Sequence, residues 1–367
     1  MLAASWDLPT GLEELYMENS SHPALILIEG LPGSGKSTLA HFLTRCFARQ
    51  GIASRWWYEE ESGHPLYLFH DQASLQQVFD ELAAGNYRQV VDAVLEKWRA
   101  LSRTIQTSRT VVIFDSCLFG YLTWTLFPYD VPIAAISAYL MQVEQIIRAN
   151  NPRLIYLYQD DVAAAFRKVC ARRGGDTEQR FVRNATESAY GKRHGLRGFD
   201  DMVSFWRSYR AITDDAFSRI RFPKLAIENA AGDWFAYERA AVRFLGLSIT
   251  QATEPTVQQP ERFVGAYYLR CDAAEVVCRV RWENNDLLVD GLPLVWPENR
   301  LVPIAENRFA VESFPFTVEF EEDGLGGIAT MIVTGAALLS GTIDTIFVRK
   351  RDKTECDRRP SMPTLPK

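Results

Sequence analysis

A glycine-rich loop between two apolar segments constrains the fold of this chain more than any other feature. Residues 24–28 (ALILI) form a short continuous apolar run, which is typical of a strand buried on both faces of a sheet. The pattern Gly-x-x-x-x-Gly-Lys-Ser follows at residues 30–37, and residues 36–50 place apolar side chains on one helical stripe. A strand, this loop and a helix in that order predict a phosphate-binding loop.

The chemistry of such a loop follows from its residue types. Glycines allow backbone conformations that other residues avoid, so successive N–H groups can turn toward one anion, and the dipole of the following helix adds to the attraction. We expect Lys36 to reach the β- and γ-phosphates of ATP and the Ser37 hydroxyl to ligate Mg²⁺. The residues predicted to hold the nucleotide here are Gly30, Gly33, Ser34, Gly35, Lys36, Ser37 and Thr38.

Strand and helix patterns alternate along the first two thirds of the chain. Four further apolar runs of strand length occur, at residues 53–58, 110–115, 153–158 and 224–229. Helical patterns separate them, so the strands should be parallel, with crossover helices on both faces. The sequence therefore predicts an α/β fold over residues 1–247, namely the three-layer P-loop NTPase fold with a five-stranded parallel sheet.

The residue pattern changes after position 247. Residues 248–261 are polar and contain two prolines, which indicates a linker, and residues 351–367 are expected to form a tail. Between them, residues 262–350 alternate apolar and polar side chains, with hairpin-turn signals such as Asn284-Asn285. We predict a second, all-β domain here, a small antiparallel barrel or sandwich.

The charge balance and the cysteine pattern exclude several classes of protein. A net charge of −6 over 367 residues argues against a nucleic-acid partner held by a global positive field. No apolar run approaches the roughly 18 residues that a membrane span needs, and the N-terminus lacks a signal-peptide pattern. The six cysteines form no CxxC pair and no zinc-ligand spacing. We therefore expect a reduced, cytoplasmic protein with no nucleic-acid or membrane partner.

The residues after the third strand separate kinases from other nucleotide-binding proteins. The chain has no Asn-Lys-x-Asp segment, which argues against a GTPase switch. The strand at residues 110–115 ends in Asp115, followed by serine rather than by the glutamate that polarises water in many ATPases. A small-molecule kinase fits better, with Asp115 holding the magnesium water shell or orienting the acceptor. The alternative for Asp115 is a structural cap.

An acidic loop follows the second strand and would lie at the carboxyl edge of the sheet, where open α/β folds bind ligands. Glu60 is the predicted catalytic carboxylate, and Glu59 and Glu61 are expected to contact the acceptor, although any of the three could accept its proton. The alternative is a solvated acidic loop. Further acceptor contacts are expected from His64, Trp57 and Phe119, since aromatic walls suit an apolar acceptor; the alternative for these aromatic residues is core packing.

A basic stretch follows the fourth strand. Residues 165–210 carry eleven Lys or Arg against five Asp or Glu. A closing lid needs arginines to neutralise charge on the transferring phosphoryl group and a hinge, and a Gly-Gly pair follows Arg173. We predict a lid-like segment at about residues 165–200, with Arg172 and Arg173 catalytic and Arg167 contacting the nucleotide. The alternative is a charged helical surface.

These motifs together resemble the P-loop kinases of the nucleoside-monophosphate-kinase type, thymidylate-kinase-like or chloramphenicol-phosphotransferase-like. The resemblance is carried by GLPGSGKST, EEESGHP, FDS, RKVCARRGG and AIENAAGDW. It implies transfer of the γ-phosphoryl group of ATP to a small acceptor, with Asn229 near the adenine. Thymidylate kinases usually have Asp-Arg-Tyr where this chain has Asp115-Ser116-Cys117, so the arginine for a monophosphate acceptor is missing. The all-β segment resembles a small lipocalin-like domain.

The sequence therefore predicts an ATP- and Mg²⁺-dependent phosphotransferase acting on a hydroxyl of a small molecule, whether metabolite, antibiotic or nucleotide. The alternative is a nucleotide-dependent regulatory ATPase or binding protein, in which ATP controls the β domain. Three roles remain open for that domain: it could cover the acceptor site, form a homodimer or stabilise the chain.

Overall fold

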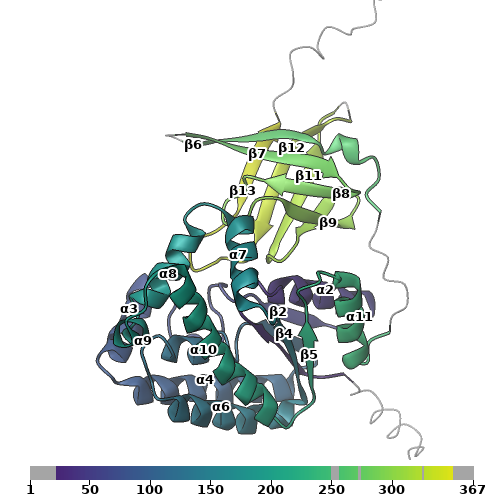
Figure 1. Cartoon of the computed structure of the whole chain (residues 1–367). Coiled ribbons are helices and arrows are strands. Elements are labelled where there is room, and N and C mark those ends of the chain that lie inside the picture. The colour runs from purple at the N-terminus through teal and green to yellow at the C-terminus, as the bar shows by residue number, and fades with distance from the viewer. Residues whose placement is uncertain (1–21, 249–255, 272–273, 325, 350–367) are drawn as a thin grey trace, which may run out of the picture. The chain divides into compact units, whose positions relative to one another are not determined.

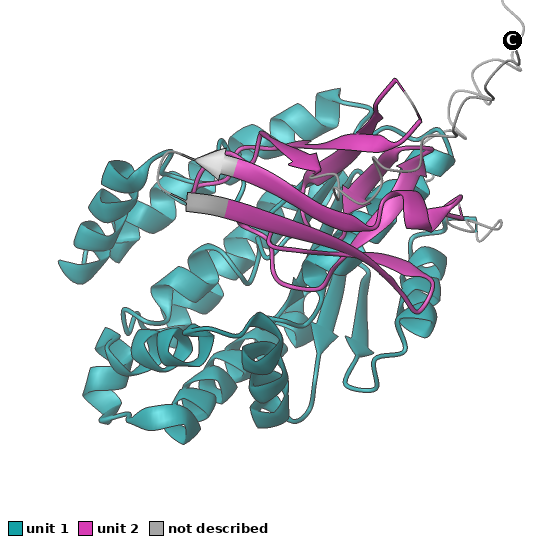
Figure 2. Cartoon of the chain, turned by 90° about the horizontal axis from the view of Figure 1, so that it is seen from above, with its two compact units in different colours: residues 1–252 teal, residues 253–367 magenta. Residues whose placement is uncertain are grey.

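The computed structural model describes residues 22–248, 256–271, 274–324 and 326–349. The chain divides into two compact units, residues 1–252 and 253–367 (Figure 2). The division falls inside the segment predicted as a linker, and the predicted tail lies outside the described residues. Among the described residues, no helix combines the length and the apolar character that crossing a bilayer requires.

The first unit is built on a parallel sheet of five strands in the order β2-β3-β1-β4-β5 (Figure 1). The strands are β1 (Leu25–Gly30), β2 (Ser54–Trp57), β3 (Val111–Asp115), β4 (Pro152–Tyr158) and β5 (Lys224–Glu228). Every residue of β3 is buried, because helices cover both faces of the sheet. The predicted α/β fold class is confirmed.

Helices connect the strands and form the two outer layers of this unit. They are α2 (Lys36–Arg49), α3 (Gln72–Ala83), α4 (Tyr87–Thr107), α5 (Leu122–Leu126), α6 (Ile133–Ile147), the 3-10 turn η1 (Arg148–Asn150), α7 (Val162–Arg173), α8 (Thr177–Thr186), α9 (Ala189–His194), α10 (Gly198–Arg219) and α11 (Trp234–Phe244). Figure 1 shows α2 and α11 on one face of the sheet and α4, α6 and α10 on the other. The buried indole N–H of Trp98 in α4 donates to the hydroxyl of Tyr139 in α6 at 2.9 Å, which joins two helices of one layer.

The register of the central strands brings the functional segments to one edge of the sheet. Ile28 of β1 pairs with Asp115 of β3, and the N–H of Ser116 donates to the carbonyl of Ile28 at 3.0 Å. Because parallel strands point the same way, the loop after β1 and the turn after β3 leave the sheet together. Asp115 therefore lies beside the glycine loop.

The second unit is a closed antiparallel barrel in the order β10-β11-β12-β13-β6-β7-β8-β9. Its elements are the 3-10 turn η2 (Pro260–Arg262), β6 (Gly265–Cys271), β7 (Ala274–Glu283), β8 (Asp286–Asp290), β9 (Asn299–Ala305), β10 (Arg308–Val311), β11 (Phe316–Glu322), β12 (Ile328–Gly335) and β13 (Thr345–Arg349). Asn284 and Asn285 both have positive φ, at 52° and 67°, as a two-residue hairpin turn requires. Of the two predicted all-β forms, the structure is the barrel.

Aromatic side chains fill the barrel interior. The rings of Phe263, Phe309 and Phe320 lie 4.9 to 5.6 Å apart, centroid to centroid, and all three are buried. Alternate residues of each strand point inward, so the period of two in the sequence becomes a single apolar core. Tyr267 joins this core, and its hydroxyl donates to the carbonyl of Phe263 at 2.8 Å.

We predict that Phe309→Ala lowers the free energy of unfolding of the barrel by about 3–5 kcal/mol, because a fully buried ring leaves a cavity. Calorimetry of the full chain measures the change as a shift of the barrel transition. Ile346→Ala is the matched control, since Ile346 lies in the same barrel with 57% of its surface exposed. Equal shifts for the two variants would contradict the assignment of Phe309 to the core.

Candidate active site

The glycine loop after β1 is packed tightly between two helices. Gly33 and Gly35 have φ of 76° and 88°, in the left-handed region that favours glycine. A Cβ on Gly33 would lie 1.9 Å from Cγ2 of Val169 in α7, and a Cβ on Gly35 would lie 2.1 Å from Cη2 of Trp234 in α11. A side chain at either position would therefore displace a helix or open the loop.

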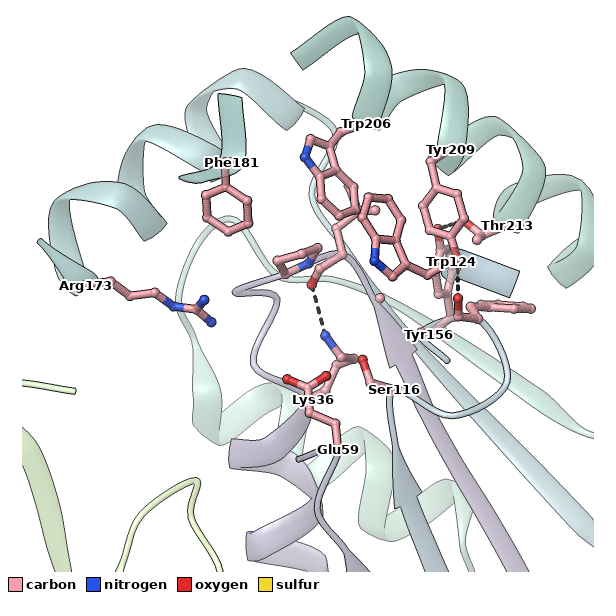
Figure 3. A pocket seen from close by; sticks show the side chains of 15 residues that line it. Lys36, Glu59, Ser116, Trp124, Tyr156, Arg173, Phe181, Trp206, Tyr209 and Thr213 are labelled. Atoms are coloured by element: carbon pink, nitrogen blue, oxygen red, sulfur yellow. Dashed lines mark hydrogen bonds between the residues drawn. The ribbon is translucent and has the colours of Figure 1, made fainter. Parts of the chain in front are cut away.

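Lys36 begins α2 directly after this loop. Its side chain is 6% exposed and folds back over the loop, where Nζ donates to the carbonyl of Leu31 at 3.2 Å (Figure 3). Ser37 and Thr38 follow in the first turn of the helix, both half-buried. The structure thus gathers the ammonium group and the helix N-terminus at one place, an arrangement that suits a polyphosphate.

Asn229 holds the glycine loop by a side-chain hydrogen bond to its backbone. It follows β5, is 4% exposed, and its Nδ2 donates to the carbonyl of Ser34 at 2.5 Å. Its own N–H donates to the carbonyl of Tyr158 at 2.9 Å, which ties the end of β5 to the end of β4. The sequence suggested a place near the adenine for Asn229; the structure shows it holding the backbone of the loop.

Asp115 is a fully buried carboxylate with no hydrogen-bond partner for either oxygen among the described residues. Burial, with the Glu59 carboxylate nearby, raises the pKa of Asp115 to about 8. The Ser37 hydroxyl, the Lys36 ammonium and the indole N–H of Trp56 lie close enough to Asp115 to oppose this shift. A buried acid left without partners destabilises the fold, so its position at the sheet edge favours a role in binding.

The residues around Asp115 fit a magnesium ion that is bound together with a nucleotide. Within the described ranges, no group of three or more His, Cys, Asp or Glu side chains could hold a metal by itself. Magnesium in nucleotide sites takes one or two protein oxygens and completes its shell with phosphates and water. The two unpartnered oxygens of Asp115 and the neighbouring hydroxyl of Ser37 match that donor set.

Glu29 is a second buried carboxylate, and the sequence analysis missed it. Its Oε1 accepts from the N–H of Cys117 at 2.9 Å and of Leu118 at 2.5 Å, and burial raises its pKa to about 7. These bonds fix the turn after β3, in which Ser116 has a φ of 60°. A charged residue in an apolar strand, next to Gly30, was the signal that could have revealed it.

A cavity of about 190 Å³ opens beside the glycine loop. One end is formed by Gly30, Leu31, Pro32 and Lys36, with Glu59 and Arg173 beside them. The other end is aromatic, with Trp124, Phe181, Trp206 and Tyr209 (Figure 3), and Phe119 also lines the cavity. The cavity therefore connects the predicted phosphate site to a separate aromatic compartment.

The three glutamates of the acidic loop point in different directions. Glu59 lines the cavity, whereas Glu60 is exposed and Glu61 is buried in an ion pair with Arg55. A tight turn, closed by the N–H of Glu61 on the carbonyl of Tyr58 at 3.0 Å, causes this divergence. The structure thus places Glu59, which was expected to contact the acceptor, in the cavity lining, leaves Glu60 exposed, and pairs Glu61 with Arg55.

The three predicted arginines of α7 also separate. Arg173 lines the cavity, where the negative charges of Glu59 and Glu60 attract its guanidinium group. Arg172 is exposed, and Arg167 lies over the ring of Phe199 at 5.2 Å, away from the loop. Val169 packs on the loop, so helical spacing places Arg173, four residues later, on the same face and Arg167 on the opposite one.

Of the three further acceptor contacts predicted beside the glutamates, namely His64, Trp57 and Phe119, only Phe119 lines the cavity. His64 stacks on Tyr67 at 4.1 Å in a separate aromatic cluster, and burial lowers its pKa to about 3, so it stays neutral. Trp57 lies under the guanidinium of Arg55 at 4.1 Å. Both side chains therefore serve the packing of the segment after β2.

Two tryptophans that the sequence analysis did not place in the site form one wall of the cavity. Trp124 and Trp206 stack with ring centroids 4.2 Å apart and planes at 6°. Trp206 comes from α10, far along the chain from the loop, and no local motif marks it.

We predict that Asp115→Asn stabilises the protein in the absence of nucleotide, and increasingly so from pH 5 to pH 8. The folded state holds a proton on Asp115 up to a pKa of about 8, whereas the unfolded chain releases it near pH 4. Ionisation therefore opposes folding, and stability falls as pH rises between these values. The difference in free energy of unfolding between the variant and the wild type should therefore grow by a few kcal/mol, at about 1.4 kcal/mol per pKa unit.

Thermal unfolding of both proteins at pH 5 and pH 8 tests this. Asp92→Asn, which changes an exposed carboxylate, serves as control and should show no growing difference. A difference in stability between Asp115→Asn and wild type that stays constant from pH 5 to pH 8 would contradict the raised pKa of Asp115.

Comparison with known proteins places this geometry in context. No protein-family model matches the chain, and no curated protein matches its sequence. Among solved structures, the chain is similar to the thymidylate kinase from Candida albicans, with 16% sequence identity and a TM-score of 0.30. That match covers 60% of this chain and 92% of the other. At this level of similarity the comparison assigns neither a family nor a substrate.

Proposed function

We propose that the protein is an ATP- and Mg²⁺-dependent phosphotransferase that moves the γ-phosphoryl group to a hydroxyl of a small molecule. One observation supports this most: a single cavity begins at Lys36 and continues into an aromatic compartment, with Glu59 and Arg173 beside its loop end. A phosphate donor at one end and an acceptor at the other would meet near Lys36. Positioning of two substrates is the main catalytic contribution in phosphoryl transfer.

The nucleotide would be held by the loop and its supports. The backbone N–H groups at the start of α2 and the ammonium of Lys36 would bind the phosphates, and Asn229 keeps the carbonyl of Ser34 in place. Ser37 and Asp115 would hold the magnesium ion, which would neutralise charge on the phosphates. Asp115 would have to be ionised to act as a ligand, whereas burial raises its pKa to about 8 in the protein without a cation.

The transfer step exchanges one P–O bond for another. The acceptor oxygen forms a bond to the γ-phosphorus, and the bond from that phosphorus to the β–γ bridging oxygen breaks, so that ADP leaves. The acceptor proton passes to the carboxylate of Glu59, which lines the cavity. Lys36 and Arg173, at the same end of the cavity, stabilise the charge on the transferring group.

A nucleotide-dependent regulatory protein is the alternative, and variants of the loop and of Asp115 distinguish the two. Lys36→Ala should abolish ATP binding under either function, because the loop loses its cation. If the protein is a kinase, Asp115→Ala should abolish transfer and still leave ATP binding measurable. The regulatory function does not predict this combination. Calorimetric titration with ATP and a coupled assay of ADP release over a panel of nucleotide, antibiotic and metabolite alcohols measure both quantities. ATP binding without release for any acceptor would favour the regulator.

We further predict that Glu59→Gln lowers kcat by about 10²–10⁴-fold and leaves ATP affinity unchanged, since the amide cannot accept the proton of the acceptor. Glu60→Gln is the matched control, one residue away and exposed. The comparison is made with the acceptor that the panel identifies, by steady-state kinetics. Equal losses in the two variants would indicate a general effect of the acidic loop instead of a base.

A further inference from the structure

The aromatic compartment of the cavity restricts the chemistry of its ligand. Its walls are the rings of Phe119, Trp124, Phe181, Trp206 and Tyr209, contributed by the turn after β3 and by α5, α8 and α10. Trp124 and Trp206 are stacked face to face, so each ring holds the other in one orientation. Flat apolar or aromatic groups bind such walls well.

The positive charges of the cavity lie at its other end. Among the described residues that line it, Lys36 and Arg173 are the cations, and Figure 3 shows both near the glycine loop, with Glu59 beside Lys36. Lys36 is needed to bind the phosphates of ATP. The charge of Arg173 is partly balanced by the nearby carboxylates of Glu59 and Glu60. A phosphate ester in the aromatic compartment would have no cation of its own, and an unpaired buried charge is costly.

The hydroxyl groups of two tyrosines that line the cavity, Tyr156 and Tyr209, already have partners. The Tyr209 hydroxyl donates to the carbonyl of Phe119, and the Tyr156 hydroxyl donates to Asp214 at 2.8 Å and lies 3.0 Å from the Thr213 hydroxyl. The indole N–H of Trp206 is different, because this side chain is 5% exposed and its nitrogen has no partner among the described residues. Figure 3 shows that nitrogen on the side of the ring that faces Phe181. An indole N–H only donates, so the missing partner is an acceptor atom.

We propose that the acceptor substrate is an uncharged, planar aromatic or heteroaromatic alcohol that packs on the Trp124–Trp206 wall and offers one oxygen or nitrogen to the indole N–H of Trp206. The proposal rests on the proposed function in taking this cavity as the acceptor site. It predicts that a nucleoside or aryl alcohol binds better than the phosphate ester of the same compound. Discrimination comes from the desolvation of a charge that the compartment cannot pair.

Binding is tested on the full chain saturated with a non-hydrolysable ATP analogue and Mg²⁺, which fill the phosphate end beside Lys36. The ligands are matched pairs: thymidine against dTMP, cytidine against CMP, and 2-phenylethanol against its phosphate ester. Quenching of tryptophan fluorescence and calorimetric titration report affinity without requiring turnover. We expect each neutral member to bind at least about tenfold more tightly than its ester. Ester binding equal to or tighter than that of the alcohol overturns the proposal, and so does the absence of binding by every neutral member.

Trp206→Phe tests the hydrogen bond, because it keeps an aromatic ring and removes the donor. We expect affinity for the best neutral ligand to fall about fivefold, the size of one ordinary hydrogen bond, with ATP affinity unchanged. Unchanged affinity for that ligand overturns the assigned contact, and the wild-type pairs decide the charge question even if this variant fails to fold. Failure of wild-type protein to bind ATP would instead contradict the proposed function, so the two failures are distinguishable.

Discussion

The packing of the glycine loop between α7 and α11 is the constraint on which the site depends. Val169 and Trp234 occupy the space that side chains at positions 33 and 35 would need, and Asn229 fixes the loop carbonyl from below. Because the loop cannot relax, the first turn of α2 and Lys36 have a defined place relative to β3. The contact of Val169 with the loop also orients α7. Arg173 lies one helical turn after Val169 on the same face of α7, so this orientation brings Arg173 to the cavity.

Two buried carboxylates make this region unfavourable for the fold by itself. Oε1 of Glu29 accepts hydrogen bonds from the turn after β3, whereas neither oxygen of Asp115 has a hydrogen-bond partner in the part of the chain that the structure describes. Burial raises the pKa of both carboxylates. Functional sites commonly keep such groups at a cost in stability that the surrounding core offsets. Here the core is the fully buried β3 strand and the helices on both faces of the sheet. A bound cation and nucleotide would relieve the cost, which links binding to stability.

The parts of the site that sequence analysis located are those determined by local pattern. The loop, Lys36 and Asp115 follow from an apolar run ending in glycines or in a carboxylate, and the parallel register then places them at one sheet edge. The structure separates neighbouring residues that the sequence pattern grouped together. Glu59 instead of Glu60 lines the cavity because of one tight turn, and Arg173 does so instead of Arg167 because of helix phase relative to Val169. Both depend on packing that a residue pattern does not contain.

The sequence by itself determined the order of strands, helices and turns, the position of the glycine-rich loop between the first strand and the first helix, and the change from a helical to a two-residue period. These features rest on local backbone preference and on apolar periodicity. Only the tertiary structure decided that the all-β unit closes as a barrel, that Glu29 holds the turn after β3, and that Trp206 faces Trp124. These features need contacts between segments far apart in the chain, and such contacts are chosen by the packing of the whole unit.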